Sequence, residues 1–362
     1  MNILIFSWRD PKNPKAGGAE IVTHEHAKAW HKAGHSVTLF TSSFKEGKES
    51  EILDGITIIR KGDPFFTVYL RAFLWYMFEK HDKFDLVVDH FHGISFFTSL
   101  YVKEKKIAFI HEVAKDVWKL NPWPKPLHLI PFMLGTVVEP WIFKLYREIT
   151  FLTVSESTKE DLIAWGIPEK NIRIIHNGTK ILHSKVLSGK ERRQTIVFLG
   201  ALEKDKGIED VFKVFKYLKD KEPGWQFWII GKGQEKYKNL RGQNIKYWGY
   251  VSEKEKFDLL AKAHVLINPS IREGWGLVNL EASAMGTPVV AYDVPGCRDS
   301  VKQNETGFLV KSGDYIELAE KIIELMKNKV LYEKFRRNAI SWSKNFNWEK
   351  STKESISFIN SL

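Results

Sequence analysis

The sequence predicts an α/β protein built from two parallel-sheet domains of similar construction. Short apolar runs alternate with amphipathic stretches along the chain, which is typical of parallel strands covered by helices. This alternation stops at a polar stretch, residues 179–194, and then starts again. A length of 362 residues is too great for one ordinary core and fits two domains. We therefore expect an amino-terminal domain at 1–178, a linker at 179–194 and a carboxyl-terminal domain at 195–345.

In the first half, apolar runs predict buried strands, and helical spacing of apolar residues predicts a helix at 19–32 that Gly34 ends. A second helix is expected to open at Ser157, where Thr158 and Asp161 suit a first turn. The predicted strands are 3–7, 36–41, 85–89, 107–110, 150–155 and 171–175.

The second half repeats the pattern, and two polar-faced helices are expected to close the chain. Its predicted strands are 195–199, 226–230, 245–248, 265–268 and 288–291, and its predicted helices are 208–218, 253–262 and 279–285.

The composition limits the possible partners and compartments. A net charge of +11 favours an anionic partner, which can be nucleic acid, anionic lipid or a phosphorylated small molecule. Zinc-ligand spacing, aromatic ribonucleoprotein motifs and dense basic runs are missing from the sequence, so nucleic acid is disfavoured. The single Cys297 fits a reducing compartment, and no run approaches the ~20 apolar residues of a membrane span. We expect a cytoplasmic protein.

The segment 268–291 carries the strongest chemical signal. A strand ends, a turn with Gly274 and Gly276 follows, and a helix begins, so backbone amides are available to a diphosphate. Glu273 in the turn and Glu281 in the helix can both accept hydrogen bonds from sugar hydroxyls. The simpler alternative is an ordinary strand, turn and helix with two surface glutamates.

This segment resembles the Glu-Gly-x-Gly-Leu-x-x-x-Glu signature of the retaining glycosyltransferases of family 4, and the resemblance extends over nearly the whole chain. It implies the GT-B fold, in which two Rossmann-like domains face a central cleft and a carboxyl-terminal helix, here about 346–362, crosses back to the amino-terminal domain. It also implies that Glu273 contacts the donor sugar and Glu281 the ribose. The neighbouring donor contacts would be Arg272, Gly274, Trp275 (where the family often has Phe), Gly276 and Leu277.

Further residues match the family in order along the chain. Gly17 and Gly18 join the first strand to the first helix, where the resemblance places the donor phosphates; an ordinary strand–helix loop is the alternative. Lys206 resembles the lysine that neutralises the leaving diphosphate. Ala201 stands where the family has an arginine, so either Lys204 or Arg272 replaces that cation, or Lys206 and backbone amides act without it.

The same likeness assigns two turns and one histidine to the ligand. Gly231 and Val251 follow strands at positions that hold the nucleobase through the backbone. His111 follows the strand 107–110 at the edge where α/β sheets bind ligands, and the family has a histidine there near the transferred sugar. A buried core histidine is the alternative. His90 and His92 end the preceding strand, and the sequence does not rank them.

The resemblance implies retention by front-face attack, in which the departing phosphate accepts the proton of the acceptor. A UDP- or GDP-sugar would be the donor substrate, without metal or other cofactor, since no Asp-x-Asp motif stands near a strand end. Aromatic and basic residues at 65–78 and 118–146 suggest a peripheral enzyme at the inner face of the membrane with a lipid-linked or glycan acceptor. Alternatively, these residues form the domain core or a dimer contact.

Three other functions are alternatives to a glycosyltransferase. A catalytically inactive nucleotide-sugar-binding protein is favoured only by Ala201, and a nucleotide-sugar epimerase of the same fold would need no acceptor. An NAD-dependent oxidoreductase is disfavoured because no complete Gly-x-Gly-x-x-Gly follows the first strand of either domain.

Overall fold

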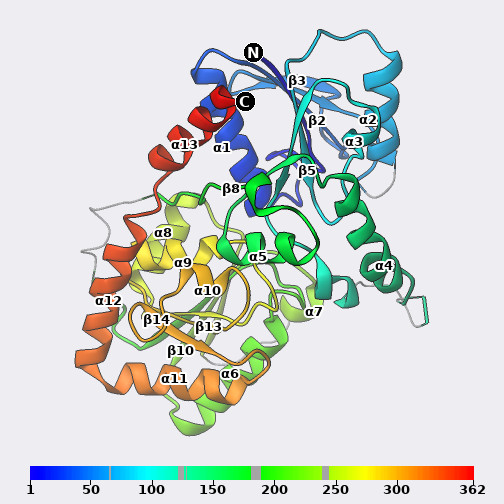
Figure 1. The fold of residues 1–362 in the computed structure, drawn as a ribbon. Coiled ribbons are helices and arrows are strands. Elements are labelled where there is room, and N and C mark those ends of the chain that lie inside the picture. Colours follow the sequence, from blue (N-terminus) through cyan, green and yellow to red (C-terminus); the bar gives the residue numbers. More distant parts are fainter. Residues whose placement is uncertain (65–66, 121–125, 128, 181–188, 239–243) are drawn as a thin grey trace. The chain divides into compact units, whose positions relative to one another are not determined.

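The computed structural model describes residues 1–64, 67–120, 126–127, 129–180, 189–238 and 244–362 (Figure 1). The chain forms two compact units, one of Met1–Asn177 with Trp348–Leu362 and the other of Gly178–Asn347. We call them the amino-terminal and the carboxyl-terminal unit. Each contains a sheet of mainly parallel strands accompanied by helices, as the sequence predicts.

In its described part, the amino-terminal unit has an eight-stranded sheet in the order β3-β4-β2-β1-β5-β6-β7-β8. Only β3 runs antiparallel to its neighbour. The strands are β1 (Asn2–Phe6), β2 (Ser36–Thr41), β3 (Ser50–Leu53), β4 (Ile56–Arg60), β5 (Leu86–Phe91), β6 (Lys105–Ile110), β7 (Thr150–Thr153) and β8 (Ile172–Ile174).

The hairpin of β3 and β4 was not predicted. Its turn is Asp54-Gly55, and both residues have positive φ, 49° and 83°. Such a two-residue turn matches the twist of antiparallel strands. The polar residues of β3 hide the strand pattern in the sequence.

The helices of the amino-terminal unit connect these strands. They are α1 (Gly18–Lys32), α2 (Thr67–Phe78), α3 (Thr98–Tyr101), α4 (Leu129–Leu145), α5 (Glu156–Ala164) and α13 (Trp348–Ser361), with two 3-10 turns, η1 (Lys115–Leu120) and η2 (Glu169–Asn171). Helix α5 begins before the predicted Ser157, because the Ser155 side chain caps it by accepting a hydrogen bond from the Thr158 amide (3.1 Å).

Helix α13 returns to the amino-terminal unit after the whole carboxyl-terminal unit has been traversed, and lies beside α1 (Figure 1). The indole Nε1 of Trp30 in α1 donates to Ser355 Oγ in α13 (2.8 Å), and both side chains are buried. The rings of Trp348 and His26, the latter also in α1, pack in a T-shaped arrangement with centroids 6.3 Å apart. The predicted return of the carboxyl-terminal helix is therefore confirmed.

In its described part, the carboxyl-terminal unit has a parallel six-stranded sheet in the order β11-β10-β9-β12-β13-β14. After its last strand, this unit ends with two helices, Tyr315–Lys327 and Lys329–Ser343. The strands are β9 (Thr195–Leu199), β10 (Gln226–Ile230), β11 (Ile245–Gly249), β12 (Val265–Asn268), β13 (Val289–Tyr292) and β14 (Gly307–Val310); the helices are α6 (Ile208–Lys221), α7 (Glu235–Lys238), α8 (Glu253–Lys262), α9 (Leu277–Ala284), α10 (Cys297–Ser300), α11 (Tyr315–Lys327) and α12 (Lys329–Ser343).

The predicted linker 179–194 is described at its two ends, and residues 181–188 lie outside the described residues. At its start, the Thr179 amide donates to Phe346 O (2.9 Å). Near its end, Lys190 Nζ donates to Ala263 O (2.7 Å) and Thr287 Oγ1 (2.8 Å), and burial lowers the pKa of this lysine well below its usual value. Both described ends of the linker are therefore fixed on the carboxyl-terminal unit.

The strand orders identify where each unit binds ligands. The chain reverses its direction of travel across the sheet between β1 and β5 in the first unit, and between β9 and β12 in the second. Open α/β sheets bind ligands at the carboxyl ends of such strand pairs. Ligand contacts are therefore expected in the loops that leave β1, β5, β9 and β12.

Candidate functional site

The turn 269–276 leaves β12 at the reversal point of the carboxyl-terminal sheet and ends at the amino terminus of α9. Gly276 occupies the position before the helix with φ +69°. A Cβ atom there would lie 2.6 Å from Ser300 Oγ and 2.8 Å from Asn279 Nδ2, so only glycine fits. Gly276 therefore allows the turn to lead directly into α9, and the first backbone amides and the dipole of this helix favour an anion.

The structure brings together two of the three predicted catalytic residues. Lys206 Nζ lies 3.0 Å from Glu273 Oε1, which also accepts a hydrogen bond from Ser270 Oγ (2.7 Å). The two charged side chains are 27% and 16% exposed, so the pair is accessible without being fully solvated. A cation and a hydroxyl acceptor at one sheet edge are what a phosphorylated sugar requires.

Two close backbone contacts hold the loop of Lys206 against the turn of Glu273. The Ile271 amide donates to Asp205 O (2.9 Å). Gly207 has φ +69°, and a Cβ there would lie 2.0 Å from Pro269 O. The glycine next to Lys206 therefore permits the loop after β9 to touch the turn after β12, and this contact sets the position of the ion pair.

A buried network of amide side chains, which the sequence analysis missed, supports the turn 269–276 from the interior of the unit. Asn268 Nδ2 donates to Asn279 Oδ1 (2.9 Å), and Asn279 Nδ2 donates to Ser300 Oγ (2.9 Å). Asn268 Oδ1 accepts from the Ser270 amide (3.2 Å), and Ser300 Oγ donates to Gly296 O (2.8 Å). The available signal was Asn279, a polar residue among the apolar neighbours at the start of α9.

Glu281 has a different partner from Glu273. Its carboxylate pairs with Lys256 Nζ of α8, and burial raises its pKa above the usual value for glutamate. The side chain is 15% exposed, so it is not fully enclosed by the protein. The predicted contact of Glu281 with a ribose stays a prediction.

The other predicted donor residues of this segment differ in exposure. Trp275 is 4% exposed and its ring packs against Phe346 at 5.0 Å, which makes it part of the core of this unit. Arg272 is also buried, Gly274 lies in the turn, and Leu277 is the first residue of α9. Their donor contacts stay predictions.

Gly231 and Val251 follow β10 and β11. The Gly231 amide already donates to Gly249 O (2.8 Å), and its carbonyl accepts from the Tyr247 hydroxyl (2.9 Å). A Cβ at Gly231 would lie 1.8 Å from Gly200 O, so close packing of the two backbones is enough to require glycine at this position. Val251 is half-buried against the core. A nucleobase contact of these two residues is untested.

The structure also locates the position where the family has an arginine. Ala201 follows β9 and is exposed. Lys204 Nζ lies 3.8 Å from Glu209 Oε1, and both side chains are about half exposed. Lys206 is the nearby cation whose contact with Glu273 the structure shows directly.

In the amino-terminal unit, the predicted phosphate loop precedes α1. Gly17 is the residue before the helix, and its amide donates to Glu20 Oε2 (2.7 Å), a buried carboxylate in the first turn of α1. Gly18 is the first helical residue. Glu20 therefore already satisfies the Gly17 amide, and the phosphate contacts of both glycines stay predictions.

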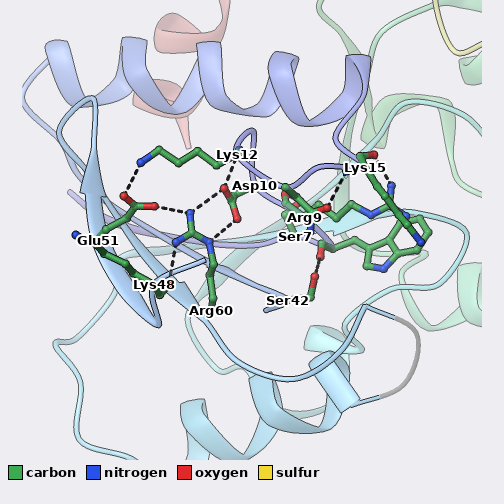
Figure 2. A network of polar contacts seen from close by, with 11 residues as sticks. Ser7, Arg9, Asp10, Lys12, Lys15, Ser42, Lys48, Glu51 and Arg60 are labelled. Carbon is green, nitrogen blue, oxygen red and sulfur yellow. Dashed lines mark hydrogen bonds and ion pairs between the residues drawn. The ribbon is translucent and has the colours of Figure 1, made fainter. Parts of the chain in front are cut away.

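A buried arginine fixes the loop that leads to these glycines. Figure 2 shows Arg60, at the end of β4, reaching Asp10 in the loop after β1. Its Nε and Nη2 donate to the two Asp10 oxygens (2.7 and 2.9 Å), and Glu51 also pairs with it. Hydrogen bonds from Lys12 and Arg60 hold the pKa of Glu51 below its usual value. This loop is thus anchored to the sheet edge by charge pairs.

The third predicted catalytic residue, His111, lies directly after β6 and is 9% exposed. Its ring is next to Phe109 (4.7 Å between centroids) and His90 (5.0 Å), and His90 is next to His92 (4.3 Å). Burial lowers the pKa of each of these three imidazoles, so they are neutral at neutral pH. The carboxyl edge of β5 and β6 thus holds a cluster of uncharged imidazoles.

The two aromatic segments divide between core and surface. In α2, Val68, Ala72 and Trp75 are buried. In α4, residues spaced by four form an exposed apolar stripe: Leu129, Met133, Val137, Trp141 and Leu145, with exposures of 47%, 62%, 58%, 63% and 46%. Of the residues named for these segments, 65–66, 121–125 and 128 lie outside the described residues.

The described residues contain neither a cluster of metal ligands nor a helix that could span a membrane. No group of three or more His, Cys, Asp or Glu side chains within the described ranges could hold a metal ion. Within the same ranges, no helix has the length and apolar character that crossing a membrane requires.

Two family models match consecutive parts of the chain. Glycosyltransferase Family 4 matches residues 16–181, and Glycosyl transferases group 1 matches residues 180–342. Among curated proteins, the capsular polysaccharide biosynthesis glycosyltransferase CapM of Staphylococcus aureus is 30% identical over 48% of this chain and 46% of its own length. A phosphatidyl-myo-inositol mannosyltransferase of Mycobacterium leprae is 28% identical over 59% of this chain and 58% of its own. The chain thus spans about half the length of these relatives.

Solved structures match over nearly the full length. Sucrose-phosphate synthase from Thermosynechococcus elongatus has a TM-score of 0.82 at 19% identity and covers 99% of this chain and 98% of its own. HepE from Anabaena, in complex with UDP and glucose, has a TM-score of 0.74 at 16% identity and covers both chains completely (100%). These likenesses show the fold. The GT-B fold of these structures and the two family models, each of which matches less than half of the chain, together support a GT-B glycosyltransferase.

Proposed function

We propose that this protein is a retaining glycosyltransferase that moves a sugar from a nucleotide-diphosphate donor to a glycan or lipid-linked acceptor. The observation that carries the proposal is the Lys206–Glu273 pair (3.0 Å) at the strand reversal of the carboxyl-terminal sheet, beside the amino terminus of α9. This arrangement offers a cation and helix amides to a diphosphate and a carboxylate to sugar hydroxyls.

In the proposed mechanism, charge stabilisation is the main contribution of the protein. As the glycosidic bond breaks, negative charge grows on the leaving diphosphate, and Lys206 together with the dipole of α9 stabilises it. The leaving phosphate accepts the proton of the acceptor hydroxyl, which attacks from the same face and so retains the configuration. Glu273 orients the donor sugar and, through its contact with Lys206, also the cation.

The relatives support the donor class and the range of acceptors. HepE was crystallised with UDP and glucose, which supports a UDP-sugar; a GDP-sugar remains the other proposed donor. The name of the mycobacterial relative includes a lipid, phosphatidyl-myo-inositol, and that of CapM a capsular polysaccharide. Both acceptor types agree with the proposal.

The test is nucleotide release from a panel of UDP-, GDP-, ADP- and CMP-sugars, with and without membrane lipid extract. Release of one nucleoside diphosphate that rises with lipid would support the transferase, the donor and a lipid acceptor. The anomeric configuration of the product, read by proton NMR, tests retention, and activity in excess EDTA tests metal independence. Inversion, or loss of activity with EDTA, would contradict those parts of the proposal.

We further propose that the exposed stripe of α4 places the enzyme on the inner face of the membrane. Apolar side chains on one helix face, with Lys144 Nζ 4.0 Å above the Trp141 ring, suit an interface with anionic lipid. Flotation with anionic liposomes tests this. The Met133→Ser/Trp141→Ser variant should float less than the wild type, whereas Leu70→Ser, at an equally exposed position of α2 (57%), should not differ from it. Equal flotation of all three proteins would refute the role of α4.

A second candidate function, binding without catalysis, is favoured by the exposed Ala201 in the place of the family arginine. It predicts that a nucleotide sugar binds and that no nucleotide is released. In that case Ala201→Arg should restore turnover. An epimerase would instead convert the donor sugar in the absence of any acceptor.

A further inference from the structure

His90 stands apart from the other histidines because its environment defines its hydrogen-bonding state. It lies in β5 next to the reversal point of the amino-terminal sheet and is fully buried (0% exposed). Its Nδ1 is 3.1 Å from two hydroxyl oxygens, Ser7 Oγ after β1 and Thr23 Oγ1 in α1. Its ring stacks on Phe109 with centroids 5.0 Å apart.

The two hydroxyl groups have other acceptors for their own hydrogens. Thr23 Oγ1 donates to Ala19 O (3.0 Å), and Ser7 Oγ donates to Arg9 O (3.3 Å). With those hydrogens used, both oxygens can only accept from His90 Nδ1. This arrangement favours the neutral imidazole with its hydrogen on Nδ1, which leaves Nε2 with a free lone pair.

Nε2 of His90 is buried and has no hydrogen-bond partner among the described residues. An unpaired buried acceptor is unfavourable, so a partner that the protein does not supply is expected there. The surroundings become more open toward the neighbouring rings, since His111 is 9% exposed and His92 is half-buried. Burial lowers the pKa of His90 well below its usual value, so protonation does not compete with hydrogen bonding at neutral pH.

We propose that His90 Nε2 accepts a hydrogen bond from a sugar hydroxyl bound at the carboxyl edge of β1 and β5, and that Ser7 and Thr23 are positioning residues that fix its tautomer. The inference rests on the proposed glycosyltransferase function, because it takes the ligand to be a sugar. The sugar can belong to the donor or to the acceptor, and both present the same hydroxyl chemistry. A buried water on Nε2 is the alternative.

The direct test is NMR of the full protein labelled with ¹⁵N-histidine, in which the His90 signals are assigned by their loss in His90→Gln. A hydrogen on Nδ1 and a free lone pair on Nε2 are expected in the unliganded protein. The Ser7→Ala/Thr23→Val variant should shift the tautomer toward Nε2–H. A wild-type protein with its hydrogen on Nε2 would overturn the proposal.

Ligand probes then separate the sources of the hydroxyl. UDP-glucose and GDP-mannose are compared with UDP and GDP, which lack the sugar, and with methyl α-glucoside and methyl α-mannoside. A change of the Nε2 shift with a sugar nucleotide but not with its nucleotide assigns the contact to the donor, and a change with a methyl glycoside assigns it to the acceptor. No change with any sugar means a buried water only and overturns the proposal.

Two substitutions distinguish the role of Nε2 from that of Nδ1. His90→Asn can still donate to Ser7 and Thr23 but has no group at Nε2, and we expect sugar affinity to fall about tenfold or more. His90→Gln keeps an amide oxygen near Nε2 and should lose less. His26→Phe, which replaces another buried imidazole of the same unit, should leave sugar affinity unchanged. Equal affinities for His90→Asn and His90→Gln, at equal melting temperatures, would count against the proposal.

The His90 contact and the proposed transferase function can be refuted independently of each other. Nucleotide release without a His90 response would leave the transferase intact and remove this contact. A His90 response to sugars without nucleotide release would keep the contact and support the binding protein.

Discussion

Replacing Asn279 by alanine should loosen the turn that holds Glu273. Asn279 is fully buried, and its amide bridges Asn268 and Ser300 with two hydrogen bonds of 2.9 Å. The alanine leaves the Asn268 amide donor buried and unpaired, and Ser300 Oγ loses one donor. At about 1–3 kcal/mol for a buried group without a partner and about 1 kcal/mol for the second bond, we expect the carboxyl-terminal unit to lose about 2–4 kcal/mol.

Hydrogen exchange read by mass spectrometry is the appropriate assay, because a chain with two units need not unfold in one step. The slowest amides of β12 and α9 should exchange about 30- to 700-fold faster in Asn279→Ala, since 1.4 kcal/mol corresponds to about a factor of ten. The amides of β1 and β5 should not change, because they belong to the other unit.

The control is Asn338→Ala, which removes a solvent-exposed hydrogen bond from Asn338 Nδ2 to Glu305 O (3.0 Å) and should cost about 0.5 kcal/mol or less. We also expect Asn279→Ala to bind nucleotide sugars more weakly, since Asn268 holds the Ser270 amide at the start of the turn. Exchange rates within twofold of those of Asn338→Ala would refute the idea that this network supports the site.

Three further predictions follow from single contacts. Lys206→Ala should lower kcat by about 10²–10³-fold, because it removes one group that stabilises developing charge. The stability of the fold should change little, since a partly exposed ion pair contributes only about 0–1 kcal/mol. Lys204→Ala is the control, and a similar loss of kcat in both variants would contradict the role of Lys206 at the leaving phosphate. Gly231→Ala should destabilise the protein more than Gly313→Ala in thermal unfolding, because both have positive φ but only the Gly231 Cβ meets a backbone atom, at 1.8 Å. Burial lowers the pKa of His26 from 6.5 to about 4, so below pH 6.5 the unfolded chain takes up a proton that the folded chain refuses. As the pH falls from 6.5 to 4, this residue therefore lowers the free energy of unfolding by about 3 kcal/mol. The free energy of opening of α1, measured by hydrogen exchange, should depend less steeply on pH in His26→Phe than in the wild type. An unchanged slope would be evidence against this pKa.

The sequence predicted best those elements whose signals are local. Strand β12 has its predicted bounds, because a run of apolar residues defines it, and α9 begins at Leu277, two residues before the predicted start of its helix. Shorter elements with mixed polarity were missed. Strand β3 carries Ser50 and Glu51, although the Asp54-Gly55 pair between two apolar stretches was a usable hairpin signal.

The candidate site was predictable only in part for the same reason. The family motif pointed to Lys206 and Glu273, and the structure shows them in contact across 67 positions of sequence. Side-chain networks that join separate elements have no local signature. The partners of His90 come from the end of β1 and from α1, and Asn279 joins β12 to α10 through Asn268 and Ser300. Their positions depend on strand order, which spacing alone does not reveal.

The return of α13 has a consequence for synthesis on the ribosome. Residues 348–361 are made after the whole carboxyl-terminal unit, although they complete the amino-terminal one. When a nascent chain has reached Asn347, the second unit has all its residues, while α1 still lacks the helix that covers Trp30 and accepts its indole hydrogen. We therefore expect the amino-terminal unit to remain incomplete, with Trp30 uncovered, until the carboxyl-terminal unit and α13 have left the ribosome. A chain cut after Asn347 should expose that same surface permanently, which makes α1 the place where chaperone binding to a truncated product would be seen first.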